Sequence, residues 1–292
     1  MSRVACSLPG TVGEWVQGWI LPDGEALVSL VVQWRGEVRL RTGPEGGQKL
    51  PPKAYRALQL ARERFSLGGG RVEVHNPLRP ALGLGTSTMD VGGVLAGAAA
   101  LSGRALDPEE LFRLCCEIEP SDGTMFPRLA LVDHLKGTLV EALPAPPPMH
   151  LAVLLPFRTL DTESYRKDRS VMKAVRDRGP RHAKAYQILK EGLTEANPRK
   201  VAAAATLSAI LQQAVMPREE WPLLLAACRE CRGLGLAVAH SGTASGVIFP
   251  DEQGAECARR WFRSRWDAGE IATVPVSGGG LLVREESDPP TA

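Results

Sequence analysis

The sequence predicts an α+β fold built in two parts. Helix-like segments and short apolar, strand-like runs alternate along the 292 residues. A proline-rich stretch at 143–148 interrupts the pattern, and four prolines in six residues fit neither a helix nor a central strand. We therefore expect an N-terminal domain over residues 1–146, a C-terminal domain over 147–285, and a frayed polar tail at 286–292.

The N-terminal part contains segments of both helix and strand type. Strands are expected at 26–33, 37–42 and 70–75, and helices at 52–65, 88–101 and 108–118. The last helix has clear start signals. Asp107 can cap it, Pro108 suits its first position, and Glu109 and Glu110 favour the positive end of its dipole.

The C-terminal part alternates in the same way. It is expected to contain a buried strand at 150–156, helices at 181–193, 198–215 and 221–232, a strand at 237–238, a glycine-rich turn, a strand at 246–249, a helix at 251–267, and a strand at 271–276 with 281–283 as its candidate continuation. Mixed, alternating elements of this kind suggest an α+β architecture in this part as well.

Composition excludes several classes of function. Lys plus Arg is 35 and Asp plus Glu is 33, a balance that argues against nucleic-acid binding as the main task. No apolar run approaches the ~18 residues that a membrane span needs, and residues 1–10 lack the apolar region of a secretory signal. We therefore expect a cytoplasmic protein with reduced cysteines, in which Cys228 and Cys231 are core residues rather than a metal or redox site.

The most informative stretch is 79–90. Gly83 and Gly85 let the backbone turn tightly and bring its N–H groups close to an anion. Three hydroxyl residues at 86–88 follow, and then a helix of almost only Gly, Ala, Val and Leu. A glycine turn that opens into a helix N-terminus is a ready phosphate site. The loop lacks the Gly-Lys-Ser/Thr ending of a Walker A sequence and the third glycine of a Rossmann fingerprint.

This loop resembles the Pro-x-x-x-Gly-Leu-Gly-Ser-Ser-Ala phosphate loop of the GHMP kinases, with Thr86 and Thr88 in place of the first serine and the alanine. Residues 9–14 resemble the family's N-terminal substrate segment, and residues 236–247 resemble its third, glycine-rich motif. The resemblance implies a ribosomal protein S5 domain 2-like N-terminal domain and a ferredoxin-like C-terminal domain, with ATP between them. The residues it implies for ATP binding are Pro80, Gly83, Leu84, Gly85, Thr86, Ser87 and Thr88.

The same resemblance implies roles for the segment 117–126. Asp122 would be the catalytic base, and Glu119 would bind Mg²⁺ together with Ser87, with Glu117 as the second choice. The residues themselves predict a helix that ends before Pro120, followed by a turn that projects polar side chains. Phosphoryl transfer needs charge neutralisation and an aligned hydroxyl, which such groups can supply. A solvated helix end with a turn aspartate is the alternative interpretation.

Residues 6–18, with their Gly-Glu-x-x-Gln-Gly, are similar to one branch of the family, the L-threonine kinases of cobalamin biosynthesis. Segments 119–122, 132–134 and 161–166 also resemble this branch. The resemblance implies that ATP and L-threonine give ADP and O-phospho-L-threonine, a precursor of the aminopropanol linker of cobalamin. Homoserine or an isoprenoid alcohol as acceptor, and a catalytically silent nucleotide-binding homologue, stay open as alternatives.

An amino-acid acceptor carries an ammonium and a carboxylate, so its pocket should offer both charges. Glu14 and Asp161 could meet the ammonium, and Arg166 or backbone amides the carboxylate, although each could equally form a surface salt bridge. The predicted substrate-binding set is Glu14, Gln17, Asp161, Arg166, Ser241, Gly242 and Thr243. His240 is expected to be a structural histidine, and His134 either orients a site carboxylate or packs.

Residues 165–190 are rich in arginine and lysine. A solvated helix face accounts for this composition, and a mobile flap attracted to the triphosphate is the alternative. The expected partners are therefore small molecules, with neither nucleic acid nor membrane among them. The sequence leaves open a homodimer and the number of metal ions.

Overall fold

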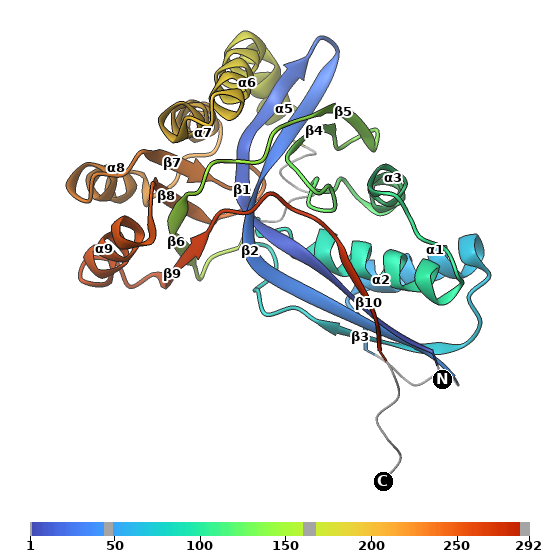
Figure 1. Ribbon diagram of the computed structural model, residues 1–292. Helices are drawn as coiled ribbons and strands as arrows, with labels where there is room; N and C mark the ends of the chain where they lie inside the picture. Colours follow the sequence, from blue (N-terminus) through green and yellow to red (C-terminus); the bar gives the residue numbers. More distant parts are fainter. Residues whose placement is uncertain (1, 44–48, 160–167, 287–292) are drawn as a thin grey trace.

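A computed structural model describes residues 2–43, 49–159 and 168–286 of the chain (Figure 1). Its strands are β1 (Arg3–Leu21), β2 (Gly24–Thr42), β3 (Gly70–His75), β4 (Ala130–Asp133), β5 (Thr138–Ala142), β6 (His150–Pro156), β7 (Gly235–Val238), β8 (Ser245–Phe249), β9 (Gly269–Pro275) and β10 (Leu282–Glu286). Its helices are α1 (Pro52–Phe65), α2 (Thr86–Leu101), α3 (Pro108–Ile118), α5 (Arg169–Asp177), α6 (Gly179–Thr194), α7 (Pro198–Gln213), α8 (Trp221–Glu230) and α9 (Glu252–Arg263).

One antiparallel sheet runs through both parts of the molecule. Its strand order is β5-β4-β2-β1-β7-β8-β6-β9, while β3 pairs with β2 and β10 pairs with β1. The long hairpin of β1 and β2 joins the two parts. Figure 1 shows α1 to α3 beside one end of it, α6 and α7 beside the other, and α8 and α9 against the strands β6 to β9. The fold is thus the predicted mixture of helices and an antiparallel sheet. The division between residues 146 and 147 stays a prediction.

Several predicted elements have the bounds that the structure shows. The segments predicted at 52–65, 70–75, 108–118 and 150–156 are α1, β3, α3 and β6. The predicted cap of α3 is confirmed, because Asp107 accepts a hydrogen bond from the Glu110 amide at 2.8 Å. The predicted strands 26–33 and 37–42 are one strand, β2, because pairing with β1 continues through Arg35 and Gly36.

Other elements differ from the prediction. Strands β1, β4 and β5 were not predicted, and α5 lies without predicted bounds in the segment expected to form a solvated helix face. The residues 281–283 were expected to continue β9, but Leu282 and Val283 instead begin β10, which pairs with β1 at the opposite end of the chain. The frayed tail was placed too early, because Glu285 pairs with Val4 and Glu286 with Arg3. Residue 286 is therefore part of the sheet.

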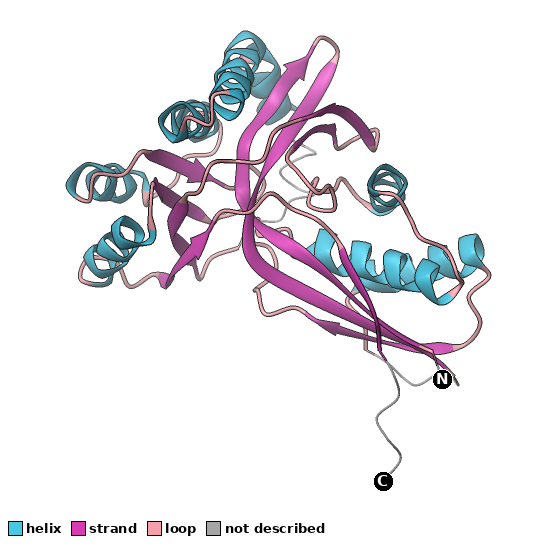
Figure 2. Cartoon of the chain, in the orientation of Figure 1, coloured by secondary structure: helices cyan, strands magenta, loops and turns pink. Residues whose placement is uncertain are grey.

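The helices enclose hydrophobic cores on the faces of the sheet (Figure 2). One core lies among α1, α2, α3 and the hairpin end that carries β3, and it buries most of α2. A second joins the centre of the hairpin to α6, α7 and β6, and it includes Leu82 and Leu84. These two leucines flank Gly83, so the loop before α2 is anchored by its side chains while its backbone stays at a surface.

Two smaller observations complete the description. Cys228 and Cys231 are half-buried, which corrects their placement in the core, and the Cys231 sulfur lies 3.4 Å from that of Cys257. Within the described ranges, no helix is both long enough and apolar enough to cross a membrane.

Candidate active site

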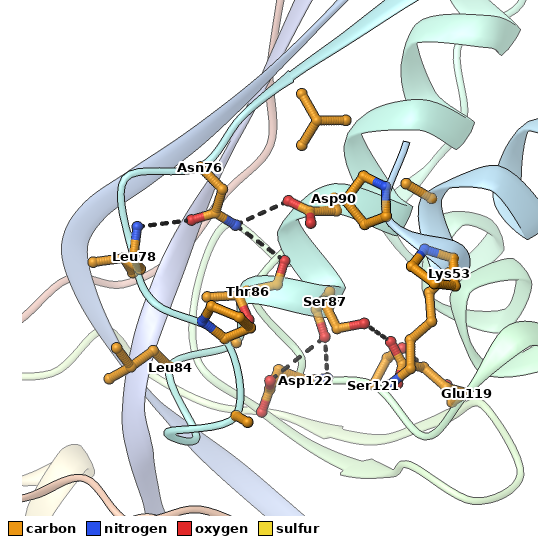
Figure 3. Close-up of a pocket in the computed structure, with 18 of the residues that line it drawn as sticks. Lys53, Asn76, Leu78, Leu84, Thr86, Ser87, Asp90, Glu119, Ser121 and Asp122 are labelled. Atoms are coloured by element: carbon orange, nitrogen blue, oxygen red, sulfur yellow. Dashed lines mark hydrogen bonds and ion pairs between the residues drawn. The ribbon is translucent and has the colours of Figure 1, made fainter. Parts of the chain in front are cut away.

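A large cleft opens where the loop before α2 meets β1, α1, β3 and the segment after α3 (Figure 3). Its volume is about 1060 Å³, at the upper end of the ~300–1,000 Å³ typical of small-molecule sites. The residues labelled in Figure 3 that line it are Lys53, Asn76, Leu78, Leu84, Thr86, Ser87, Asp90, Glu119, Ser121 and Asp122. Glu14, Gln17, His134 and Ser241 line it as well.

The loop predicted to bind phosphate forms one wall of this cleft. All seven residues predicted to bind ATP line it. Helix α2 begins at Thr86, two residues earlier than predicted, because Gly85 adopts a left-handed conformation (φ 69°) and starts the helix there. The three hydroxyl residues are therefore its first turn. In the described part of the chain, the amides of residues 85–88 have no hydrogen-bond acceptor, so they face the cleft with the positive end of the helix dipole.

The first strand holds this loop from behind. The Thr11 amide donates to the Leu84 carbonyl at 3.0 Å, and the Gly13 amide donates to the Gly83 carbonyl at 3.1 Å. Both donors lie where the register of β1 on β2 is irregular, so their N–H groups turn away from β2. The irregularity in β1 is thus what fixes the carbonyls of the loop while its amides stay available.

The glycine-rich turn between β7 and β8 supports the loop on its other side. The Ala244 amide donates to the Leu82 carbonyl at 2.9 Å, and Gly242 packs so closely on Leu82 and Gly83 that a side chain there would overlap their backbone. Gly242 and Thr243 lie outside the lining of the cleft, because Thr243 donates instead to the Arg158 carbonyl at 3.0 Å. Of the three turn residues predicted to bind substrate, Ser241 is the one that faces the cleft.

Asp122 lies at the mouth of α2. Its Oδ1 accepts from the Ser29 hydroxyl at 3.2 Å, and its Oδ2 is 3.5 Å from the Thr88 hydroxyl, the limit of a hydrogen bond. Its amide also donates to the Thr88 oxygen at 3.1 Å. A methyl group on Gly85 would lie 3.2 Å from Oδ2. The carboxylate is therefore fixed next to the exposed amides of the loop, where an acceptor hydroxyl could approach a bound phosphate.

Glu119 lies directly after α3 and forms a second acidic group at the cleft. It accepts hydrogen bonds from the Ser87 hydroxyl and from the ammonium of Lys53. Glu117, the second choice for a metal ligand, lies outside the lining of the cleft and pairs with Arg64 (3.0 Å) and Arg113 (2.7 Å). Among these glutamates, the structure therefore brings only Glu119 to the predicted metal ligand Ser87.

The other end of the cleft has apolar walls and a fixed amide. Asn76 donates to Asp90 at 2.9 Å and to the Thr86 carbonyl at 3.2 Å, and its oxygen accepts from the Leu78 amide at 3.1 Å. Burial raises the pKa of Asp90, with a further increase from the nearby charge of Glu119, although the Asn76 hydrogen bond opposes both. Apolar side chains of β3 and of the segment before α1 line this end, together with charged side chains of the same two segments. The apolar part suits a flat ring system, and the charged groups offer polar partners to it.

The end of the cleft nearest β1 holds the predicted acceptor residues. Glu14 is 6% exposed, and its Oε2 accepts from the His240 amide at 2.9 Å and from the His240 ring at 2.8 Å. Gln17 and His134 are also buried and line the cleft. His240 is hydrogen-bonded, as expected of a structural histidine. Asp161 and Arg166 lie outside the described residues.

Several polar residues at the cleft were not predicted from the sequence, among them Lys53, Asn76 and Asp90. Lys53 follows the Pro51-Pro52 pair that begins α1, and a lysine in the first helical turn, where cations are unfavourable, was an available signal. Asn76 follows the last residue of β3, and Asp90 lies one turn into α2, so neither has a local pattern that separates it from a turn or helix residue.

Comparison with known proteins identifies the class to which this fold and cleft belong. Residues 52–126 match the model of the GHMP kinases N terminal domain. A homoserine kinase from Cytophaga hutchinsonii has a similar structure, with a TM-score of 0.73 at 15% identity over 97% of each chain. A mevalonate kinase from L. major gives a TM-score of 0.68 at 14% identity, over 96% of this chain and 97% of the other.

Two curated proteins are similar in sequence as well. An L-threonine kinase of Salmonella typhimurium is 34% identical over 245 residues, which cover 82% of this chain and 81% of that protein. An L-threonine kinase of Citrobacter freundii is 33% identical over 255 residues, with 82% and 84% covered. The chain therefore belongs to the GHMP kinase family, whose members are phosphotransferases that use ATP. Of these four proteins, the two L-threonine kinases are more than 30% identical to this chain, whereas the homoserine kinase and the mevalonate kinase are about 15% identical or less.

Proposed function

We propose that this protein transfers the γ-phosphoryl group of ATP to the side-chain hydroxyl of L-threonine. The observation that carries the proposal is the free amide set at the mouth of α2, which opens into a cleft that also holds Asp122 and Glu119. The similarity to L-threonine kinases over 82% of the chain supports the choice of acceptor. The product would be O-phospho-L-threonine, and we propose that it serves as a precursor of the aminopropanol linker of cobalamin.

The site residues divide the reaction among them. The amides of residues 85–88 would bind the phosphates, and the apolar end beside Asn76 would take the nucleoside. Asp122 would accept the proton of the threonine hydroxyl while the hydroxyl oxygen bonds to the γ-phosphorus of ATP. The bond between the γ-phosphorus and the oxygen that bridges it to the β-phosphate breaks, and ADP leaves with that oxygen. Ser29 holds the Asp122 carboxylate toward the loop, and the β1 end of the cleft would orient the amino acid.

The residues around Ser87 suit a magnesium ion. Ser87 and Glu119 already lie in contact through oxygen atoms, which are the ligands that Mg²⁺ prefers. Bound Mg²⁺ would neutralise charge on the phosphates during transfer. Lys53 now compensates the charge of Glu119 and lines the cleft, so its ammonium would be available to phosphate oxygens when Glu119 binds a cation. We therefore propose Ser87 and Glu119 as the protein ligands of the metal.

Replacing Glu119 with glutamine tests this assignment. The Mg²⁺ concentration for half-maximal activity should rise about 10- to 100-fold, because a charged oxygen ligand is lost while the side-chain shape is kept. Glu117→Gln is the matched control, since Glu117 is on the neighbouring turn but pairs with Arg64 and Arg113 outside the cleft. Equal Mg²⁺ dependence in both variants would contradict the assignment.

A panel of acceptors tests the proposed reaction directly. With purified protein, ATP and Mg²⁺, ADP release should be stimulated by L-threonine, with kcat/KM at least about 10-fold above that for L-homoserine. Phosphorus NMR of the product should show a phosphate monoester on the threonine hydroxyl. If L-threonine is inert while L-homoserine or mevalonate is phosphorylated, the acceptor is wrong and the kinase class stands. We further propose a cytoplasmic location, which is supported by six cysteines, all within the described residues, that form no disulfide.

A further inference from the structure

His240 occupies a buried position between the cleft and helix α7. It follows β7, immediately before the glycine-rich turn, and it is 3% exposed. Its Nδ1 lies 2.8 Å from Glu14 Oε2, and its backbone amide donates to the same oxygen at 2.9 Å. On the other side of the ring, Nε2 lies 2.9 Å from the hydroxyl of Ser208 in α7. Each nitrogen of the ring thus has its own hydrogen-bond partner, which fixes the orientation of the ring.

The direction of these hydrogen bonds follows from the Ser208 hydroxyl. Its oxygen accepts from the Gln17 amide at 3.2 Å, which leaves its proton available for Nε2 of His240. The proton of a neutral ring then lies on Nδ1, where it donates to the carboxylate of Glu14. The side chain of Gln212 fixes the backbone as well, because it donates to the His240 carbonyl at 2.7 Å. The contacts of Ser208 and Gln212 fix the ring and the backbone of His240, and His240 in turn fixes Glu14.

Both donors from His240 reach the same oxygen of Glu14. In the described chain no group donates to its other oxygen, Oε1, and Glu14 lines the cleft. The neighbouring Gln17 also lines the cleft, and its buried side-chain oxygen has no partner among the described residues. Both side chains are buried, and each offers an acceptor oxygen without a donor among the described residues, one of them on a carboxylate. Such a pair suits a ligand group that carries only protons to donate, which is an ammonium.

The network also connects the acceptor end of the cleft to the phosphate loop. His240 continues into the turn whose Gly242 packs on Leu82 and Gly83. The same short segment therefore fixes Glu14 with one residue and supports the loop with another. A shift of the turn would change the distance between an amino acid bound at Glu14 and a phosphate bound at residues 85–88.

We propose that His240 is a positioning residue for the acceptor, which holds Glu14 so that Oε1 receives the ammonium of the amino-acid substrate. This inference rests on the proposed function, because it presumes an acceptor with an ammonium group. It assigns His240 no contact with the substrate. Its role is to fix the carboxylate that distinguishes an amino acid from a simple alcohol.

The test compares His240→Leu with His240→Asn. Leucine fills similar space without hydrogen bonds, whereas the asparagine amide can place a donor near the position of Nδ1. We expect His240→Leu to raise KM for L-threonine about 10- to 100-fold, as loss of a buried charge-positioning bond does, with KM for ATP within about threefold. His240→Asn should restore most of the loss. The preference for L-threonine over 3-hydroxybutyrate, which lacks the ammonium, should narrow in parallel.

His182→Leu is the matched control. His182 is equally buried at 3% exposure and lies near the same network, but it does not contact Glu14. Equal kinetics of His240→Leu and His182→Leu, or equal losses in KM for ATP and L-threonine, would show a merely structural histidine and overturn the proposal. If His240→Leu does not fold, Ser208→Ala replaces it in the comparison with His240→Asn. Ser208→Ala removes the hydrogen bond to Nε2 of the ring, whereas His240→Asn keeps a donor near the position of Nδ1, so KM for L-threonine should rise more in Ser208→Ala.

The wild-type panel separates this inference from the proposed function. If L-threonine is phosphorylated and His240→Leu leaves its KM unchanged, the inference fails and the function stands. If L-homoserine is the acceptor instead, the proposed function fails but the inference can still be tested. The same His240 variants are then compared with L-homoserine and with 4-hydroxybutyrate, which lacks the ammonium group. If the wild type phosphorylates only acceptors without an ammonium, both are wrong.

Discussion

Replacing Asp122 with asparagine is expected to lower kcat about 100- to 10,000-fold, with KM for ATP changed less than about threefold. Asparagine has nearly the same shape. Its amide oxygen can still accept from Ser29, and its amide nitrogen can donate to the Thr88 oxygen, so the mouth of α2 should keep its geometry. It cannot take a proton from the acceptor hydroxyl, which is the step that we assign to the carboxylate. The loss should therefore appear in the chemical step and not in nucleotide binding.

Asp133→Asn provides the matched control for this experiment. Asp133 is buried at the end of β4, and its Oδ1 accepts from the amides of Leu135 and Lys136 in a turn. That variant should lose about 1 kcal/mol of stability and keep its kcat. Rapid-quench single-turnover measurement at saturating ATP and L-threonine separates chemistry from product release. A near-normal rate in Asp122→Asn would remove Asp122 from the mechanism.

The loop before α2 was predictable as a glycine turn that opens into a helix, because its signals are local, while its binding of phosphate stays a prediction. Glycines at 83 and 85, hydroxyl residues and an alanine-rich helix are consecutive, and the structure places them at one helix mouth beside the cleft. The bounds of α1 and α3 were predictable for the same reason, since caps and prolines mark their starts. Strand β1 was missed because Pro9, Gly10 and Gly13 suggest turns. They lie instead in the irregular stretch of β1 that bonds to the loop.

The support of the site could not be predicted in this way, because it comes from distant parts of the chain. His240 and Glu14 are 226 residues apart, and Ser29 and Asp122 are 93 apart. No periodicity or spacing relates such pairs, and only the fold brings them together. The glycine-rich turn is a further example. Its composition indicated that its backbone approaches another group closely, but only the structure shows that Gly242 packs on Leu82 and Gly83 of the loop before α2.

That close approach leads to a second large effect, in Gly83→Ala. Gly83 has a left-handed backbone (φ 81°), and a methyl group there would overlap the side chain of Ala239 in the supporting turn. Left-handed strain and overpacking together should cost about 2–5 kcal/mol of stability. The loop should also move from the turn, which displaces the amides of residues 85–88 and raises KM for ATP at least about 10-fold.

Gly103→Ala separates the two causes. Gly103 has a similar left-handed backbone (φ 74°), but a methyl group there meets open space, so this variant measures the conformational strain alone. It should cost about 1–2 kcal/mol in thermal or chemical unfolding and leave KM for ATP unchanged.

The double variant Gly83→Ala/Ala239→Gly then isolates the contact, because it removes the carbon atom that the new methyl group would overlap. If the loop depends on its fit against the glycine-rich turn, the double variant should recover ATP affinity while the strain of the left-handed alanine persists. If the single and double variants bind ATP equally weakly, backbone strain alone accounts for the defect, and the turn from the second part of the chain does not position the phosphate loop.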